Sequence, residues 1–400
     1  MPLPSPLLDD RPGTATVVAH AAEGIADVVE AAHAVVARPW RRTDRARGLT
    51  GWIYRTVRRS IRWAGVGAAA LERGVPRQAP SRRQEALRAA LNGVRGDALA
   101  ASGNRLATPF SLRRDGHELD LTPRALCQTA DPSDVLLVLV HGICMHDGQW
   151  GETQAAALAA GLGATEIRVR YNSGRHISES GDDLADGLEA LLDGWPRPVR
   201  RLVIVGHSMG GLVARAALQT AAERHHRWPA HDASLVTLGS PHHGAPLERL
   251  GNAVDAALGA TRWSRPFARI GQIRSAGVTD LRWGSIREPD WADRDRFERG
   301  PDRRVPTPLP PGVAVYAVAA TTGDGSQPMQ DQTVGDGLVP LDSALGRHGT
   351  RDLGLPRDRQ WIARGMTHFD LTRRAEVTDR LLAWLAPSTA EASASEPRVA

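Results

Sequence analysis

The sequence of 400 residues contains no lysine, so all 50 of its Lys+Arg residues are arginines. It has only two cysteines, Cys127 and Cys144, which argues against a disulfide scaffold and favours a reducing compartment. The first residues, MPLPSPLLDDRPG, lack the basic and apolar regions of a secretory signal. No apolar run reaches the ~18 residues that a membrane-spanning helix needs. We therefore expect a cytoplasmic protein, with peripheral membrane contact left open.

Charge and histidine content exclude little more. The formal net charge of +5 is modest for this length and does not by itself indicate a nucleic-acid partner. The histidines gather in two short runs, neither of which has a familiar zinc-ligand spacing: His225, His226 and His231, and His242 and His243. We expect no metal and no cofactor, and we expect no nucleic-acid partner.

Residues 1–108 are predicted to form a helical N-terminal extension. Apolar residues recur every three or four positions over 14–37, and a second helix is expected around 81–100. Between them, residues 51–66 mix arginines and aromatic residues with an apolar face. A basic amphipathic helix of this kind docks on the rest of the protein, which we favour, lies in an anionic membrane interface, or, as the least favoured alternative, binds nucleic acid.

Residues 109–387 are predicted to form an α/β domain. Two short extended runs in 110–121 are joined by Asp115-Gly116, a strong hairpin signal. Buried-strand candidates then follow at 135–140, 166–171, 201–205, 234–239, 313–320 and 359–365, with helices near 151–162, 180–193, 209–225 and 375–386. This alternation favours a mostly parallel sheet with helices on both faces. We interpret 244–311 as a partly helical cap insertion and 388–400 as a disordered tail.

The stretch RLVIVGHSMGGLVARAAL, residues 201–218, places a serine between an apolar strand and a helix. In such a junction Ser208 sits in a strained turn, and glycines at positions 206 and 210 remove collisions with neighbouring backbone. The turn lifts the hydroxyl above the sheet edge, at the positive end of the following helix. The sequence therefore predicts that Ser208 is an exposed nucleophile.

A serine hydroxyl needs a base, and the base needs an acid that orients it. His368, in GMTHFDL after the last expected strand, is the candidate base. Asp336, in VGDGLVP, is the candidate acid, with Asp324 in TTGDG as its rival. The order Ser208, Asp336, His368 matches the order expected for this architecture.

Negative charge on a substrate carbonyl also needs donors that are already in place. We expect one donor to be the backbone N–H of Met209. The other is expected at Ile143, in the loop HGICMHDGQW that follows the strand 135–140. Cys144 lies beside it, but no strand–turn–helix presents its thiol, so we do not favour it as a rival nucleophile.

These motifs resemble those of α/β-hydrolases of the lipase/esterase group. The stretches VHGICMHDGQW, GHSMGGLVAR, LGSPHHGAP, GDGLVP and GMTHFDL occur in the expected order over roughly residues 110–387. The GSPHHG and DGLVP turns are similar to those of bacterial triacylglycerol lipases and inositol-deacylase-like lipases. The resemblance implies a triad of Ser208, Asp336 and His368, an oxyanion hole at Ile143 and Met209, and no cofactor. We also expect substrate contacts from His141 and His207. Arg175 and His176, in YNSGRHIS (171–178), are expected either to line the substrate entrance or to belong to a plain turn.

The sequence thus predicts a serine hydrolase that cleaves small-molecule or lipid esters through an acyl-enzyme. A thioesterase or a polyester depolymerase with the same triad stays open, as does a non-catalytic lipid- or membrane-associated binding protein, because a fold alone does not fix function. Acyl chain length and oligomeric state are left open.

Overall fold

The computed structural model describes residues 82–129, 131–245, 275–296, 301–324 and 335–386. The helices expected at 14–37 and 51–66, the membrane contact expected of the latter, and the tail at 388–400 lie outside these ranges. In the part of the chain that is described, no helix combines the length and the hydropathy needed to cross a bilayer.

The centre of the molecule is an eight-stranded sheet with the order β2-β1-β4-β3-β5-β6-β7-β8. Neighbouring strands are parallel throughout the segment β4-β3-β5-β6-β7-β8 of this order. Strand β1 runs antiparallel to both β2 and β4. The bounds are β1 Ser111–Arg114, β2 His117–Glu118, β3 Val135–Val140, β4 Thr165–Arg170, β5 Arg201–His207, β6 Ala233–Leu238, β7 Ala314–Thr321 and β8 Gln360–Arg364. The predicted mostly parallel sheet is confirmed.

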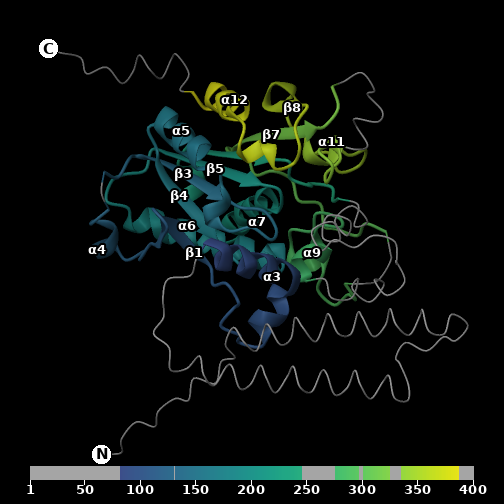
Figure 1. The fold of residues 1–400 in the computed structure, drawn as a ribbon, viewed down its shortest axis with the longest axis horizontal. Coiled ribbons are helices and arrows are strands. Elements are labelled where there is room, and N and C mark those ends of the chain that lie inside the picture. The colour runs from purple at the N-terminus through teal and green to yellow at the C-terminus, as the bar shows by residue number, and fades with distance from the viewer. Residues whose placement is uncertain (1–81, 130, 246–274, 297–300, 325–334, 387–400) are drawn as a thin grey trace, which may run out of the picture.

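Helices cover both faces of this sheet (Figure 1). One face carries α6 (Ile177–Gly194) and α7 (Met209–Glu223), and the other carries α5 (Glu152–Leu162) and α12 (Ala375–Leu385). Alternate residues of a strand point to opposite faces, so Leu136 packs with the α6 side and Leu137 with the α5 side. Both faces of β3 are therefore buried, which is why its sequence VLLVLV is apolar throughout.

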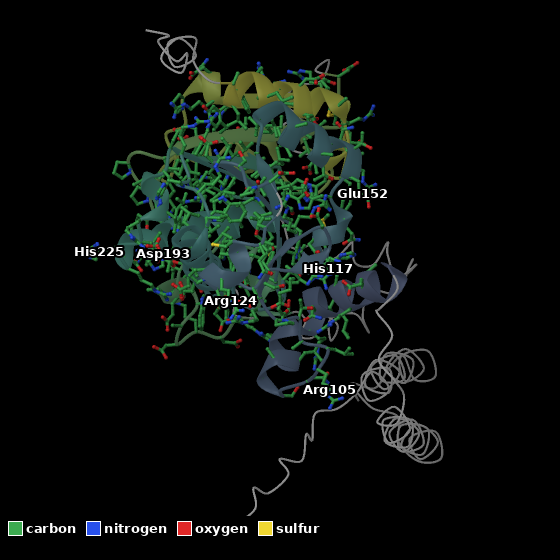
Figure 2. The ribbon with its side chains drawn as sticks, turned by 90° about the vertical axis from the view of Figure 1, so that its left-hand side faces the viewer. Arg105, His117, Arg124, Glu152, Asp193 and His225 are labelled. Atoms are coloured by element: carbon green, nitrogen blue, oxygen red, sulfur yellow. The ribbon has the colours of Figure 1, made fainter. Side chains whose placement is uncertain are left out.

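The predicted hairpin is also confirmed. Asp115 and Gly116 connect β1 to β2 with φ of 50° and 78°, so both residues are in the left-handed region. A two-residue turn with two positive φ values matches the right-handed twist of the flanking strands. Figure 2 shows His117, the first residue of β2, at the outside of the molecule together with Arg105, Arg124, Glu152, Asp193 and His225.

Two elements extend beyond their predicted bounds by two residues or more. Strand β5 continues to His207, because Gly206 and His207 still pair with β6. Helix α6 begins at Ile177, earlier than the expected position near 180, and its first N–H groups have acceptors: Glu179 accepts from His176 N, and Asp280 accepts from Ile177 N. Side-chain acceptors of this kind satisfy the free N–H groups at a helix N-terminus.

The N-terminal side of the described chain adds one long helix, α3 (Arg82–Ala101), where a helix over 81–100 is expected. It lies beside the short helix α9 (Ala276–Asp280), which belongs to the expected insertion 244–311 (Figure 1). Arg95 interrupts α3 with a non-helical backbone (φ −137°, ψ 15°).

Candidate active site

Ser208 occupies the junction between β5 and α7 with φ of 55° and ψ of −124°. Its N–H donates to the carbonyl of Leu238 at 2.8 Å, which ties the junction to the end of β6. A Cβ at position 206 would lie 2.5 Å from the Cα of Gly211, and one at position 210 would lie 2.2 Å from the carbonyl oxygen of Val140. Only glycine fits at both places, so the predicted strained turn is present.

The side chains of His368 and Asp336 meet in a buried hydrogen bond. His368 follows β8, and its Nδ1 lies 2.6 Å from Oδ2 of Asp336. The other carboxylate oxygen of Asp336 accepts from the N–H groups of Leu338 at 2.9 Å and Val339 at 2.8 Å. Burial opposes ionisation of this carboxyl, but His368 and the two backbone donors outweigh it and hold the pKa of Asp336 below its usual value.

Two contacts join this pair to the serine junction. A Cβ at Gly239, the residue after Leu238, would lie 3.1 Å both from Oδ2 of Asp336 and from Nδ1 of His368. The ring of His207, the neighbour of Ser208, lies 4.7 Å from the ring of His368. The structure therefore places the His368–Asp336 pair against the residues next to Ser208 at one edge of the sheet, although the three residues come from distant stretches of sequence. The rival acid, Asp324, is exposed.

The loop after β3 forms a turn directly beside Ser208. Met145 N–H donates to the Gly142 carbonyl at 3.3 Å, and a Cβ at Gly142 would lie 3.0 Å from the Cβ of Ser208. Among the described residues, neither Ile143 N–H nor Met209 N–H has an acceptor. Ser208 is only 8% exposed, so the prediction of an exposed nucleophile is wrong as to exposure. Two unused donors close to this serine are the arrangement that a developing oxyanion requires.

His141 and His207 lie below this turn and are fully buried. His207 Nε2 is 3.1 Å from the carbonyl of His368, and His141 Nδ1 is 2.8 Å from the carbonyl of Gly142. Since a carbonyl only accepts, each of these nitrogens carries a proton, and the other ring nitrogen has no partner in the described structure. Burial lowers the pKa of His207 to about 3 and that of His141 to about 4, so both rings are neutral at pH 7.

Arg175 and His176 are engaged by acidic partners near the start of α6. Arg175 pairs with Asp183 at 2.6 Å, and Nδ1 of His176 lies 3.0 Å from a carboxylate oxygen of Asp280. The imidazole of His176 also stacks on Trp291, with ring centroids 3.6 Å apart. These contacts account for both side chains structurally, and a role at the substrate entrance stays a prediction.

One aromatic residue of the site was not singled out by the sequence. Phe369 is 49% exposed and is the one large apolar side chain exposed within the described ranges. Its ring lies 5.7 Å from that of His368 and 6.3 Å from that of His207. The sequence showed an aromatic residue directly after the candidate base His368. Only the structure shows that Phe369 is exposed, where polar side chains are normally favoured.

The described residues hold one trio of side chains with metal-ligand atoms close together: Glu85, His146 and Asp147. Arginines already neutralise both carboxylates. Arg170 bridges Glu85 and Asp147 at 2.5 Å each, and Arg113 adds a second contact to Asp147 at 3.1 Å. Two guanidinium groups at the carboxylates leave no negative charge to attract a cation, so this cluster is an ion-pair network.

The comparisons with known proteins agree with this architecture. Residues 168–299 match the model of the PGAP1-like alpha/beta domain. No curated protein matches the chain. Together with the sheet order, this family match confirms the predicted α/β-hydrolase fold.

Solved structures similar to the chain include three lipases or esterases. The mature lipase BlEst2 of Bacillus licheniformis is 19% identical with a TM-score of 0.42, over 64% of this chain and 94% of that one. The esterase Pf2001 of Pyrococcus furiosus is 14% identical with a TM-score of 0.37, over 63% and 81%. Lipase B of Aspergillus fumigatus is 14% identical with a TM-score of 0.38, over 68% and 59%.

The backbone of Ser208 predicts an unusual order of stabilities. Glycine adopts a positive φ without strain, so Ser208→Gly should be more stable than Ser208→Ala by about 1 kcal/mol in urea unfolding. At Ser102, which has no positive φ, the same pair should show the opposite order. If the alanine variant is the more stable of the two at position 208 as well as at position 102, Ser208 is not strained.

The neutral state of His207 predicts acid sensitivity. Below pH 6.5 the unfolded chain takes up a proton that the folded ring, with a pKa of about 3, does not. Stability should therefore fall as the pH drops from 6.5 towards 3, with this residue contributing up to about 1.4 kcal/mol per pH unit. His207→Gln should flatten the dependence of unfolding free energy on pH between 6.5 and 5 by that amount. An unchanged slope would contradict the assignment.

Proposed function

We propose that this α/β-hydrolase of the lipase/esterase group cleaves carboxylic esters through an acyl-enzyme. The observation that carries the proposal is the hydrogen bond between His368 and Asp336, formed beside a serine held in a strained strand–helix turn. A base oriented by a carboxylate next to a hydroxyl is the constellation that activates a serine nucleophile.

The proposed reaction begins with proton transfer. Because the carboxylate of Asp336 accepts from Nδ1 of His368, Nε2 carries the free lone pair and takes the proton of the Ser208 hydroxyl. The serine oxygen attacks the ester carbonyl, and the N–H groups of Ile143 and Met209 donate to the resulting oxyanion. Protonated His368 then gives its proton to the departing alcohol.

Water completes the cycle. His368 takes a proton from the water, the hydroxide attacks the acyl-serine, and the same two N–H groups stabilise the second oxyanion. The acid is then released and Ser208 regains its proton from His368. Every step uses side chains and amides of this chain.

Phe369 supports an apolar substrate. A half-exposed phenyl ring beside the proposed base offers a surface for the acyl or alcohol portion of an ester, and its burial by substrate removes apolar area from water. We therefore propose esters with an apolar portion, including lipid esters, as the substrate class.

Removing the nucleophile tests the proposal. Ser208→Ala should lower kcat for p-nitrophenyl esters by at least ~10⁴-fold while the circular dichroism spectrum stays that of the native protein. A fluorophosphonate probe should label the native protein and leave the variant unlabelled. Equal turnover by the two proteins would overturn the proposal. Absence of both turnover and labelling in the native protein would favour a binding role.

The acid is tested by comparing two aspartates. Asp336→Asn keeps the size of the side chain but loses the charge that stabilises protonated His368, so kcat should fall by about 10⁴-fold. Asp324→Asn serves as the matched control and should stay within about 3-fold of the native protein, because the exposed Asp324 is not the carboxylate that meets Nδ1 of His368. The reverse result would reassign the acid.

A further inference from the structure

Helix α3 reaches the site from outside the segment that matches the family model, and it does so through a face of small residues. Gly93 and Gly96 lie three positions apart in α3, on either side of the kink at Arg95. Glycine inside a helix is unfavourable relative to alanine, so its presence points to a close approach of another backbone. The structure contains two such approaches.

The first approach is to the turn that carries Ile143. A Cβ at Gly93 would lie 2.2 Å from Sγ, 2.8 Å from N and 2.9 Å from Cα of Cys144. Cys144 is the third residue of the turn from Gly142 to Met145, and it has a φ of 59°. The helix backbone therefore touches the turn at its most strained residue, directly after the proposed oxyanion donor.

The second approach is to the segment after β4. Asn172 donates from its side-chain amide to the carbonyl of Gly96 at 2.8 Å, and a Cβ at Gly174 would lie 2.0 Å from the carbonyl oxygen of Asn92. The next residue after Asn172, Ser173, accepts the N–H of Cys144 at 3.1 Å. The turn is thus held between α3 on one side and Ser173 on the other.

Residues of the insertion 244–311 hold helix α3 in place. The hydroxyl of Ser275 donates to the carbonyl of Gly93 at 2.6 Å, and the N–H of Ala276 donates to the carboxylate of Asp97 at 3.1 Å. Ser275 is fully buried. The position of Gly93 against the turn is therefore set by contacts along the length of α3.

Cys144 fills this contact with a half-buried side chain whose thiol donates to the carbonyl of Ala90 at 3.9 Å. Burial raises the pKa of its thiol to about 11, so the thiol stays uncharged at pH 7. Its left-handed backbone costs energy for any residue with a Cβ, and it persists because the surroundings hold it. The alternative of Cys144 as a rival nucleophile does not fit a protonated thiol held against a helix.

We infer that α3 is a positioning element for the oxyanion hole: contact of Gly93 with Cys144 sets the conformation of the turn and thereby the direction of the Ile143 N–H. The inference rests on the proposed function, because it assigns a purpose to an oxyanion donor. The helix acts on the substrate indirectly, through the turn from Gly142 to Met145.

A double-mutant cycle tests the inference. Gly93→Ala should push the turn away from the helix and lower kcat for p-nitrophenyl acetate by about 10- to 100-fold, with KM within about 2-fold, because a misplaced donor affects the transition state most. Cys144→Gly removes the closest contact, that with Sγ, but keeps those with the backbone N and Cα, so in the Gly93→Ala background it should restore kcat only in part, by about 3-fold. Cys144→Ser, which keeps the size of the side chain, should not restore it.

Two controls separate this effect from others. Gly349→Ala makes the same substitution where a Cβ has no neighbour within 4 Å, and it should leave kcat unchanged. Ser208→Ala, measured in parallel, shows whether the activity is that of the proposed site. If native activity depends on Ser208 and Gly93→Ala has native kcat, the inference fails and the proposed function stands. If Cys144→Gly and Cys144→Ser restore activity equally, or neither does, the contact does not act through the turn.

A second variant covers the case in which Gly93→Ala does not fold. Cys144→Leu extends the side chain into the same contact from the side of the turn and leaves the helix sequence intact. It should show the same loss of kcat with little change in KM. A native kcat in folded Cys144→Leu would overturn the inference.

Discussion

The site depends on one strained junction, in which Ser208 keeps a left-handed backbone between β5 and α7. Close glycine contacts on both sides hold it there: position 206 lies against Gly211, and position 210 lies against the end of β3. Since neighbouring parallel strands end at the same edge of the sheet, the junction and the turn after β3 are brought together by the pairing of β3 with β5. Packing therefore supplies the energy that the strained serine costs.

Buried neutral imidazoles lie near the hydrogen-bonded pair of His368 and Asp336. His141 and His207 are neutral at pH 7 because burial disfavours their charged forms, so neither adds a positive charge beside His368. Asp336 is the buried carboxylate that faces His368, and two backbone N–H groups hold it in its ionised form. In the proposed reaction a proton that reaches His368 is thus stabilised by one partner, and the nearby imidazoles do not compete for it.

Local patterns predicted the strands, the hairpin and the serine turn. A run such as VLLVLV indicates a strand that is buried on both faces. The glycines around Ser208 indicate close backbone contacts. Each of these signals lies within a few adjacent residues. The bond between His368 and Asp336 was predicted from the order of motifs, while its geometry needed the fold.

The features that the sequence did not predict depend on residues far apart in the chain. The start of α6 at Ile177 depends on Asp280, which follows more than a hundred positions later. From the sequence alone, Gly93 is a glycine that destabilises its helix. Its close contact with Cys144, which explains why the position holds a glycine, is visible only in the structure. The predicted bounds of 1–108 and 109–387 rest on local periodicity and turn signals, and local signals do not show that α3 touches the turn beside Ser208.

The proposed oxyanion donors are main-chain N–H groups, which has a consequence for how the protein can vary. A point mutation at 143 or 209 changes a side chain and leaves the amide in place, unless the new residue is proline. Most amino-acid substitutions at these two positions therefore leave the N–H donors in place. Sequence drift can alter their strength mainly through the residues that shape the turn, so selection on catalytic rate would be expected to act on neighbours that never meet the ligand.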